Sequence, residues 1–383
     1  MLGNTHEIKP VIDSPSYHFS LSKLLQLLLT FLQNFKQAEL VMDNALRQPF
    51  RCSFLWLCLF AISTVSIAQD LQQQSLNAQQ ILQEMSQAMR TLNYRGTLAL
   101  FRNGHLNTMR FYHAANGGEE QERLLALNTP LMEAIRTPSL VKCYYPDSKK
   151  IVVDHRPSRR SFLMDLPENF AESQHAYDFI FAKPEVVARL PALVVKIKPK
   201  DDFRYARKVW ISKDHYLPLR FELTDDFGDI LEQLVFTELH VVNSLPLIQI
   251  PLETKHVQHI HQLDFLDFDQ ASFTLEGMPK GFKKVSFTKQ HFHGSNKLID
   301  HLLLSDGFAS VSIYLEEGEN GNKSEPAAEH QAIGAVNIYT DRLKNYQLTV
   351  MGEVPVKTLE YIAANVRLRK QIDSSAKAAL DKP

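Results

Sequence analysis

Residues Tyr94–His113 read YRGTLALFRNGHLNTMRFYH, and this stretch decides which class of fold the chain can form. Two runs rich in aromatic and aliphatic residues flank Asn103-Gly104, a dipeptide that tolerates positive φ angles and closes tight hairpins. The stretch therefore predicts a β-hairpin. It offers no obvious nucleophile, acid pair or metal ligand, so the function has to be sought in the rest of the chain.

The alternation of short apolar runs and turn residues continues after this hairpin. Further runs lie at residues 120–128, 131–137, 140–146 and 149–155, and the pattern resumes at 192–199, 204–212, 216–225 and 230–242. A turn signal about every ten residues indicates an antiparallel meander and not a series of βαβ units. We therefore predict a large, strongly curved antiparallel sheet of about ten strands.

Two other segments favour helices. Residues 75–92 carry apolar side chains at three- and four-residue spacing, at Ala78, Ile81, Leu82, Met85, Ala88 and Met89. This spacing predicts a helix with one apolar face, which is typical of a helix that packs on a sheet. Residues 165–190 interrupt the strand pattern, and we interpret them as one or two short helices.

The N-terminal part of the chain predicts a secretory signal. Arg47 and Arg51 supply the positive segment, Cys52–Val65 supply the apolar segment, and Ser66-Ile67-Ala68 supplies small residues for cleavage after Ala68. The apolar segment is shorter than the roughly 20 residues that span a bilayer comfortably, although an uncleaved anchor is the alternative. Residues 1–41, which precede this signal, are interpreted as an upstream extension.

Composition narrows the classes of function. The chain has 42 basic and 43 acidic residues and a formal net charge of −1, so it has no overall nucleic-acid signature. Cys52 and Cys58 leave with the predicted signal, and the single remaining Cys143 excludes a disulfide framework. Cys143 lies in an apolar run and is interpreted as a packed small side chain.

The pattern divides the chain into six segments. We predict an upstream extension at 1–41, a signal peptide at 42–68, a large domain at 69–243, a linker at 244–270, a small α+β domain at 271–370 and a tail at 371–383. The linker is proposed because residues 244–270 have three separate turn or kink signals and no clean period.

Catalytic and metal motifs are weak in this sequence. His256, His259 and His261 form one histidine group, and His291, His293 and His301 form another. Neither has the HExxH pattern of a metalloprotease helix, so both are interpreted as surface histidines. The chain also lacks a G-x-S-x-G nucleophile elbow and a phosphate-binding glycine loop. We predict no catalytic residue, no metal and no cofactor.

Arg156, Arg159 and Arg160 form the densest basic cluster of the predicted large domain. They follow a predicted strand and precede a predicted helix, which places them in a loop. Three guanidinium groups this close can bind phosphate or carboxylate groups of a ligand or partner. An ordinary solvated basic loop is the alternative.

Several segments together resemble the bacterial RseB/MucB family. The resemblance rests on residues 92–113, 117–136, 141–153 and 209–223 for a first domain and on 301–316, 334–340 and 346–355 for a second. It covers about residues 70–370 in the right order, and the linker falls where the composition places it. Residues 1–41 do not belong to the pattern.

The resemblance implies a periplasmic binding protein and not an enzyme. Members of this family have a large domain similar to the carriers LolA and LolB, an unclosed β-barrel with helices, followed by a small α+β domain. They bind the periplasmic part of the anti-sigma factor RseA and protect it from DegS-type proteolysis. Lipid or lipopolysaccharide signals release this protection and activate the sigma-E envelope stress response. The alternative is a periplasmic lipoprotein or lipid carrier of LolA type.

An apolar pocket for acyl chains is predicted inside the large domain. Leu98 and Leu100 on one strand, and Met109 and Phe111 on the next, are the candidates because residues at i,i+2 share a sheet face. Plain core packing is the alternative. The expected ligands are lipopolysaccharide or lipoprotein acyl chains, and a homo-oligomer remains an open alternative to a monomer.

Overall fold

The computed structural model describes residues 78–128, 130–154, 161–248, 256–260, 265–291, 298–318 and 328–369. All of these lie in one compact unit, Leu71–Pro383. No helix within these residues is long and apolar enough to cross a membrane. The predicted signal at 42–68, the extension at 1–41 and the tail at 371–383 fall outside the described residues.

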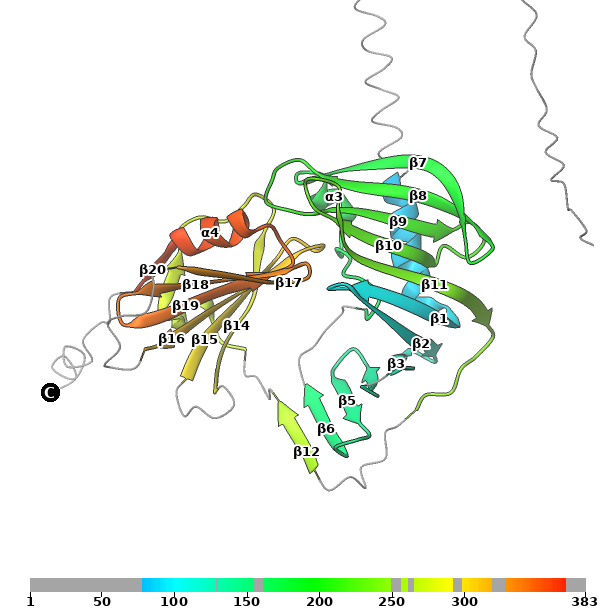
Figure 1. Ribbon diagram of the computed structural model, residues 1–383, viewed down its shortest axis with the longest axis horizontal. Helices are drawn as coiled ribbons and strands as arrows, with labels where there is room; N and C mark the ends of the chain where they lie inside the picture. Colours follow the sequence, from blue (N-terminus) through cyan, green and yellow to red (C-terminus); the bar gives the residue numbers. More distant parts are fainter. Residues whose placement is uncertain are drawn as a thin grey trace, which may run out of the picture. The chain divides into compact units, whose positions relative to one another are not determined.

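A twelve-stranded, strongly curved sheet dominates the first half of the described chain (Figure 1). Its strands run in the order β12-β6-β5-β4-β3-β2-β1-β11-β10-β9-β8-β7. Their bounds are β1 Asn93–Arg102, β2 His105–Asn116, β3 Glu119–Ala126, β4 Glu133–Arg136, β5 Val141–Tyr145, β6 Lys150–Asp154, β7 Tyr177–Val187, β8 Leu190–Pro199, β9 Ala206–Ser212, β10 Pro218–Thr224, β11 Ile230–Val242 and β12 His256–Ile260. This arrangement confirms the predicted large, strongly curved antiparallel sheet, with one parallel pair, β12 and β6, that the prediction did not include.

The hairpin predicted at residues 94–113 is confirmed. β1 and β2 pair antiparallel from Tyr94↔His113 to Arg102↔His105. Asn103 and Gly104 close the turn with φ angles of 55° and 73°. Positive φ at both central residues matches the twist of the flanking strands, and Asn-Gly tolerates it best.

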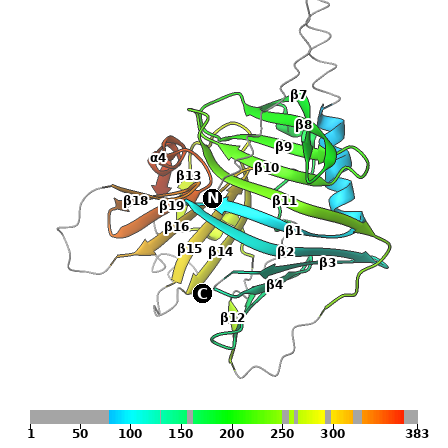
Figure 2. The ribbon, with the colours of Figure 1, turned by 45° about the vertical axis from the view of Figure 1, so that its right-hand side comes forward.

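The core of this sheet lies against the helix at residues 78–91 (Figure 2). Leu82 and Met85 are fully buried there beside Tyr94, Leu98 and Phe111. Burying a side chain of this size contributes roughly 1.5–3 kcal/mol. The predicted apolar stripe therefore packs on the sheet as expected.

Strands β8 and β9 are apolar on both faces. Val195 and Ile211 belong to the core beneath the helix, whereas Val194 and Trp210 belong to a second cluster on the opposite face. Lys208 and Arg220 lie over the Trp210 ring at 4.1 Å and 4.4 Å from its centroid, so cationic side chains cover this second cluster.

Both edge strands of the large sheet differ from the sequence prediction. The segment 165–190, predicted as helical, contains only the short helix α3 (Phe170–Ser173) before it extends as strand β7. Pro184 disfavours a central strand, but β7 is an edge strand, where a missing N–H is tolerated. Within the predicted linker, residues 256–260 form β12, which pairs parallel with β6.

A six-stranded antiparallel sheet forms the second half, in the order β14-β15-β16-β19-β18-β17. The bounds in this half are η1 Phe268–Gln270, β13 Phe273–Leu275, β14 Lys283–His291, β15 Leu298–Ser305, β16 Ser310–Glu317, β17 Glu329–Ile333, β18 Val336–Leu343, β19 Tyr346–Gly352, α4 Val356–Ala364 and β20 Val366–Leu368. β13 and β20 form a separate two-stranded ladder. The predicted small α+β fold is therefore confirmed. The domain boundaries themselves stay predictions.

Helix α4 completes the core of the second half. Its Leu359 and Ile362 are fully buried with Phe287, Val311 and Val350 of the sheet. Pro355 precedes the helix directly, and its φ of −56° suits a helix start. This core and the core beneath the helix at 78–91 are separate clusters of buried side chains.

Candidate functional site

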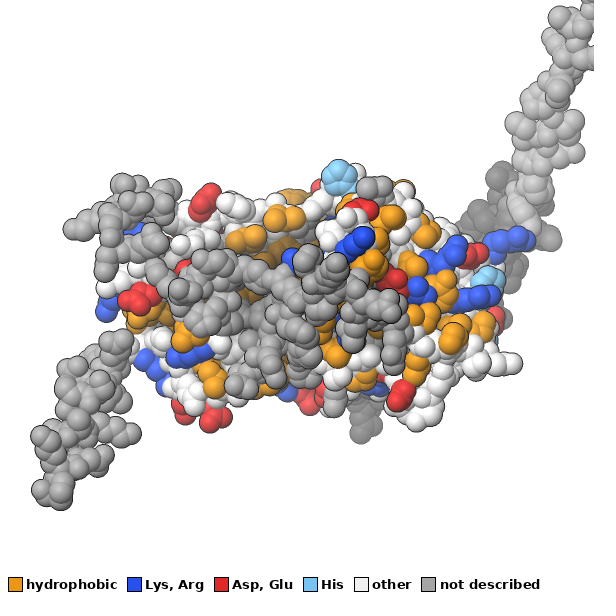
Figure 3. All heavy atoms as spheres, turned by 90° about the horizontal axis from the view of Figure 1, so that it is seen from below, with side chains coloured by type: hydrophobic (Ala, Val, Ile, Leu, Met, Phe, Trp, Pro, Cys, Tyr) orange, Lys and Arg blue, Asp and Glu red, His pale blue; other side chains and the backbone are white. Residues whose placement is uncertain are grey.

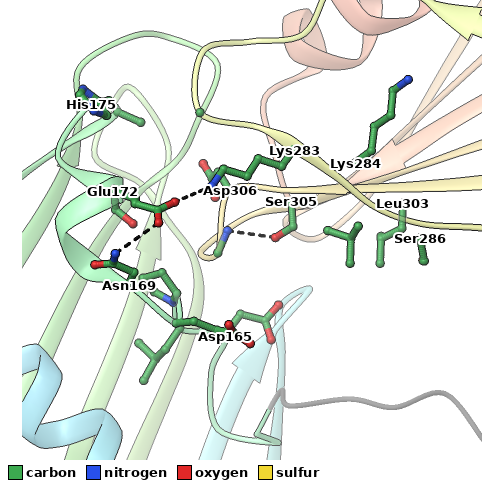
Figure 4. A pocket seen from close by; sticks show the side chains of 18 of the residues that line it. Asp165, Asn169, Glu172, His175, Lys283, Lys284, Ser286, Leu303, Ser305 and Asp306 are labelled. Carbon is green, nitrogen blue, oxygen red and sulfur yellow. Dashed lines mark hydrogen bonds and ion pairs between the residues drawn. The ribbon is translucent and has the colours of Figure 1, made fainter. Parts of the chain in front are cut away.

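A cleft of 1210 Å³ lies between the segment that carries α3 and strands β14 and β15 (Figure 4). One wall consists of residues 165–169 together with Glu172, Ser173, His175 and Ala176, and the other of residues 283–286 with Thr288, His301 and Leu303. The turn at residues 305–307 closes one end. A cleft of this size exceeds the roughly 300–1,000 Å³ of ordinary small-molecule pockets.

An ion pair connects the two walls of the cleft. The Lys283 ammonium donates to the Glu172 carboxylate, which also accepts a 3.2 Å hydrogen bond from the Asn169 amide. These two contacts hold the pKa of Glu172 below its usual value, with the Lys283 hydrogen bond as the main cause. Both charged side chains are well exposed, so a charged partner could compete for either of them. Lys284 points away from Glu172 (Figure 4).

The end of the cleft is held by a buried ion pair. Arg204 Nε lies 2.5 Å from Asp306 Oδ2, and the Tyr177 hydroxyl donates to the same oxygen at 2.8 Å. Burial alone would lower the pKa of Arg204, but the Asp306 carboxylate raises it above its usual value. Burial, with Asp306 as the second cause, raises the pKa of Tyr177 well above its ordinary range. Arg204 therefore stays charged and Tyr177 stays protonated.

The Asp306–Phe308 turn links the two cores. The Asp306 carboxylate caps the turn by accepting from the N–H groups of Phe308 and Ala309 at 3.0 Å and 2.8 Å. The Phe308 ring, a member of the core beneath the helix at 78–91, lies edge-on to Tyr177 at 5.0 Å between centroids. The second half of the chain thus supplies an aromatic side chain to the core of the first.

One wall of the cleft carries a buried polar atom without a partner. Thr288 is 2% exposed, and its Oγ1 has no hydrogen-bond partner in the described structure. Nearby, His301 stacks on Tyr314 at 4.3 Å and its Nε2 lies 3.1 Å from the Ser312 hydroxyl. A ligand group that reached this wall could satisfy the threonine hydroxyl.

The four predicted pocket residues lie on one face of the first hairpin. Leu98 pairs with Met109 and Gly96 pairs with Phe111, so the side chains of Leu98, Leu100, Met109 and Phe111 share a face. Leu98 and Phe111 are buried in the core, and Leu100 and Met109 pack against it. None of the four lines the cleft described above. Their role in holding an acyl chain stays a prediction.

Arg156, Arg159 and Arg160 lie outside the described residues, so their predicted anion binding also stays a prediction. The chain is described again from Ser161, whose hydroxyl donates to Glu122 Oε1 at 2.5 Å. The Phe162 N–H donates to the other oxygen of the same carboxylate at 2.8 Å. The residues that follow the arginine cluster are therefore tied to strand β3.

Of the histidine groups considered in the sequence, only the His301 side chain is described. The structure instead brings together His113, Glu120 and Glu122, whose ligand atoms lie within 4.8 Å of one another. No sequence motif indicates this set, because a single histidine and two glutamates on adjacent strands form no familiar pattern. Strand pairing would have revealed it, because His113 and Glu122 are register partners across the Asn-Gly-Gly turn.

Both signs of charge are present on the surface. On the face shown in Figure 3, basic and acidic side chains lie among apolar ones, and several basic side chains lie together towards the right of the view. This distribution accords with the nearly balanced totals of 42 basic and 43 acidic residues.

Comparison with known proteins identifies relatives over most of the chain. The sigma-E factor regulatory protein RseB of Haemophilus influenzae is 24% identical over 331 residues, which cover 84% of this chain and 99% of that protein. RseB of Escherichia coli K12 is 24% identical and covers 75% of this chain and 89% of its own length. The sigma factor AlgU regulatory protein MucB of Pseudomonas aeruginosa is 25% identical, with 77% and 92% coverage.

Solved structures share this fold. The Pseudomonas aeruginosa MucA/MucB complex contains a chain that is 24% identical, with a TM-score of 0.62, and the match covers 77% of this chain and 99% of that one. MucB in complex with MucA(peri) gives 23% identity, a TM-score of 0.61 and the same coverage. Family models match as well, the MucB/RseB N-terminal domain at residues 77–258 and the MucB/RseB C-terminal domain at residues 267–367. With both of its halves matched in order, the chain belongs to the MucB/RseB family.

Proposed function

We propose that this chain is a periplasmic negative regulator of a sigma-E-type factor that binds the periplasmic part of a membrane-bound anti-sigma factor of the RseA/MucA kind. The observation that carries the proposal is the match of both family domains in order, at residues 77–258 and 267–367. MucB, a relative with the same fold, has been solved in complex with MucA(peri). Regulation of this kind requires a binding surface and no catalytic group.

The cleft beside β14 is the proposed binding site for an extended segment of the partner. β14 is an edge strand of the smaller sheet, and edge strands can pair with an added peptide strand. Lys283, Lys284 and Val285 on this strand are exposed, and Phe265 nearby is 52% exposed. Apolar side chains of a peptide could contact Val285 and Phe265, while its carboxylates could contact the lysines.

Protection of the partner follows from such binding. A protease of the DegS type must bind its substrate in an extended conformation, and a segment paired with β14 would be inaccessible to it. We propose that occupation of the cleft slows the first cleavage of the anti-sigma factor. The sigma factor would then stay inhibited as long as this chain is bound.

Lipid or lipopolysaccharide signals are proposed to reverse the protection. Lipopolysaccharide carries phosphate groups, which suit the arginines at 156, 159 and 160. If an acidic stretch of the partner used the same arginines, ligand and partner would compete. A ligand shifts the equilibrium only by its differential affinity for free and partner-bound chain, and competition supplies that difference.

The alternative of a simple lipid carrier receives less support from the structure. A carrier needs an open apolar cavity, whereas Leu98 and Phe111 are buried against the helix at 78–91 and the Phe308 ring is part of the same core. That ring comes from the second half of the chain, which a carrier with only one domain would lack.

The binding proposal is tested with the purified chain and the periplasmic segment of its cognate anti-sigma factor, labelled for fluorescence anisotropy. The double variant Lys283→Glu/Lys284→Glu should weaken binding about tenfold or more, because it replaces attraction by repulsion at the edge of the cleft. Lys196→Glu/Lys198→Glu, at two exposed lysines of β8 outside the cleft, is the matched control. Absence of binding by the wild-type chain would contradict the proposed function, and equal effects of both variants would contradict the proposed site.

A further inference from the structure

A row of buried polar side chains crosses four neighbouring strands of the large sheet. Tyr94 pairs with His113, His113 with Glu122, and Glu122 with Arg136, so these residues follow one another across β1, β2, β3 and β4. Register partners point to the same face of a sheet, and so does Glu120, two residues before Glu122. His113 is 0% exposed and Glu122 is 1% exposed.

The hydrogen bonding of His113 leaves one ring nitrogen without a partner. His113 Nδ1 lies 2.7 Å from the Leu92 carbonyl oxygen, which can only accept, so Nδ1 carries the proton. In the neutral ring Nε2 then has a lone pair and no proton. This buried atom has no hydrogen-bond partner, and the Glu120 Oε1 beside it, at 3.8 Å, is itself an acceptor.

An imidazole in this arrangement has the features of a metal ligand. Histidine ligands almost always donate their second ring N–H to a carbonyl or carboxylate, which sets the tautomer and orients the ring. Leu92 provides such a carbonyl for His113, and the Tyr94 ring stacks on the imidazole at 4.9 Å with a 20° tilt. The ring is therefore held with its lone pair directed towards the glutamates.

The carboxylates of Glu120 and Glu122 have lone pairs that their present hydrogen bonds do not use. Glu122 accepts from Ser161 and from the Phe162 N–H, and Glu120 accepts from Arg136 at 3.0 Å. An ionised carboxylate offers about four lone-pair positions, so both can accept a further partner. Arg136 lies 3.0 Å from Glu120 and 3.8 Å from Glu122, so it compensates part of the negative charge of the two carboxylates.

We propose that His113, Glu120 and Glu122 bind a single Zn²⁺ ion. Zn²⁺ takes His nitrogen and Glu oxygen ligands at about 2.0–2.2 Å, which places two ligands of a tetrahedral site roughly 3.3 Å apart. The three ligand atoms already lie within 4.8 Å of one another, so shifts of about 1 Å complete the site. Glu120, whose side chain is 20% exposed, can supply that movement and gives the ion a path from solvent.

The site would act as a cross-link and not as a catalytic centre. It joins β2 to β3 through His113 and Glu122, and Glu122 in turn holds Ser161 and Phe162, the first residues after the arginine-bearing segment 155–160. Bound zinc would therefore stabilise the connection between the sheet and the segment that follows those arginines. This inference is independent of the proposed binding of an anti-sigma factor.

The test is zinc binding to the untagged chain after treatment with a chelator, measured by isothermal titration with ZnCl2. We expect one equivalent of zinc per chain. Glu120→Gln keeps the shape of the side chain but removes its charge, and it should weaken binding about tenfold or more. His113→Ala should weaken it at least as much. Thermal unfolding of both variants in the absence of metal checks that they fold.

The matched control is His240→Ala. His240 also lies close to a glutamate, Glu238, at 3.9 Å, but both side chains are more than half exposed, so this variant should bind zinc like the wild type. The inference is overturned if the wild-type chain takes up no stoichiometric zinc, or if His113→Ala and Glu120→Gln bind it unchanged. It is also overturned if ¹⁵N NMR with saturating zinc shows a proton on His113 Nε2, because a proton would then occupy the position of the ion.

Discussion

Asp306 Oδ2 lies 2.5 Å from Arg204 Nε, and the two side chains are 2% and 0% exposed. Residues 102 positions apart thus form a buried ion pair that joins the turn after β15 to the segment before β9. Arg204 Nη1 also donates to Asp201 Oδ2 at 2.6 Å. A buried pair of this kind need not add stability relative to apolar residues, but removal of one partner destabilises because the other charge stays buried with less compensation.

Asp306→Asn should therefore be strongly destabilising. We expect the free energy of unfolding to fall by about 1.5–3 kcal/mol, because Arg204 would lose its buried carboxylate and keep only the partly exposed Asp201, 2.6 Å from its Nη1. Urea unfolding followed by circular dichroism measures the change. Asp202→Asn is the control, since Asp202 is 83% exposed in its pair with Lys357 and should cost only about 0–1 kcal/mol. Similar losses in both variants would contradict the buried pair.

Gly307→Ala should destabilise the chain more than Gly104→Ala. Both glycines have positive φ, +97° and +73°, so both variants strain the backbone. A Cβ at position 307 would also lie 2.5 Å from Pro167 Cβ, whereas one at position 104 meets nothing within 4 Å. The difference between the two melting temperatures reports this steric contact together with the difference in φ. A melting temperature of Gly104→Ala equal to or below that of Gly307→Ala would contradict the close contact between the turn at Gly307 and Pro167.

Glu232 should give stability a characteristic pH dependence. Burial raises its pKa above the usual value, although Arg102, at 2.7 Å, opposes the shift. The folded chain therefore holds this proton to a higher pH than the unfolded chain. The resulting stability is fully present below the unfolded pKa and is lost as pH rises through the raised folded pKa.

The measurement compares Glu232→Gln with wild type by urea unfolding at several pH values between about 4 and 7. The wild type should lose stability relative to the variant as pH rises across this window. Glu238→Gln, at a 57% exposed glutamate on the same strand, provides the control. A wild type that gained stability relative to Glu232→Gln over the same window would show that the pKa of Glu232 is lowered.

Leu82→Ala should test the packing of the helix at residues 78–91 on the sheet. Leu82 is fully buried in the core, so its truncation should cost about 2–5 kcal/mol. Gln83→Ala, at the next and exposed position, should change the free energy of unfolding by less than about 0.5 kcal/mol. Equal effects, measured by denaturant unfolding, would contradict the placement of the apolar stripe against the sheet.

Local rules explain the parts of the fold that the sequence predicts well. The Asn103-Gly104 turn sets the register of β1 and β2, and the spacing of Leu82 and Met85 directs one helix face to the sheet. The sequence does not predict β7, because Pro184 and four consecutive exposed residues interrupt the alternation of buried and exposed side chains that is typical of a strand. β12 was not predicted because its parallel partner β6 is about a hundred residues away, and nothing local indicates such a pairing.

The candidate sites depend on contacts that span long stretches of sequence. His113 and Glu122 could have been paired by counting outwards from the Gly117-Gly118 turn, since Asn116 faces Glu119. The contact of Arg204 with Asp306 has no such local signal, because it depends on how the Asp306–Phe308 turn packs on Tyr177. Sequence patterns therefore indicate which residues share a strand face, and tertiary packing decides which of these faces meet.

Protection of the partner from proteolysis is the measurement that tests the central claim most directly. The periplasmic segment of the cognate anti-sigma factor is incubated with a site-1 protease of the DegS type, with and without a saturating concentration of this chain, and cleavage is followed on gels. The account predicts that the chain slows cleavage and that Lys283→Glu/Lys284→Glu slows it less at the same concentration. An unchanged cleavage rate, with the chain shown to be folded, would contradict the proposed regulatory function.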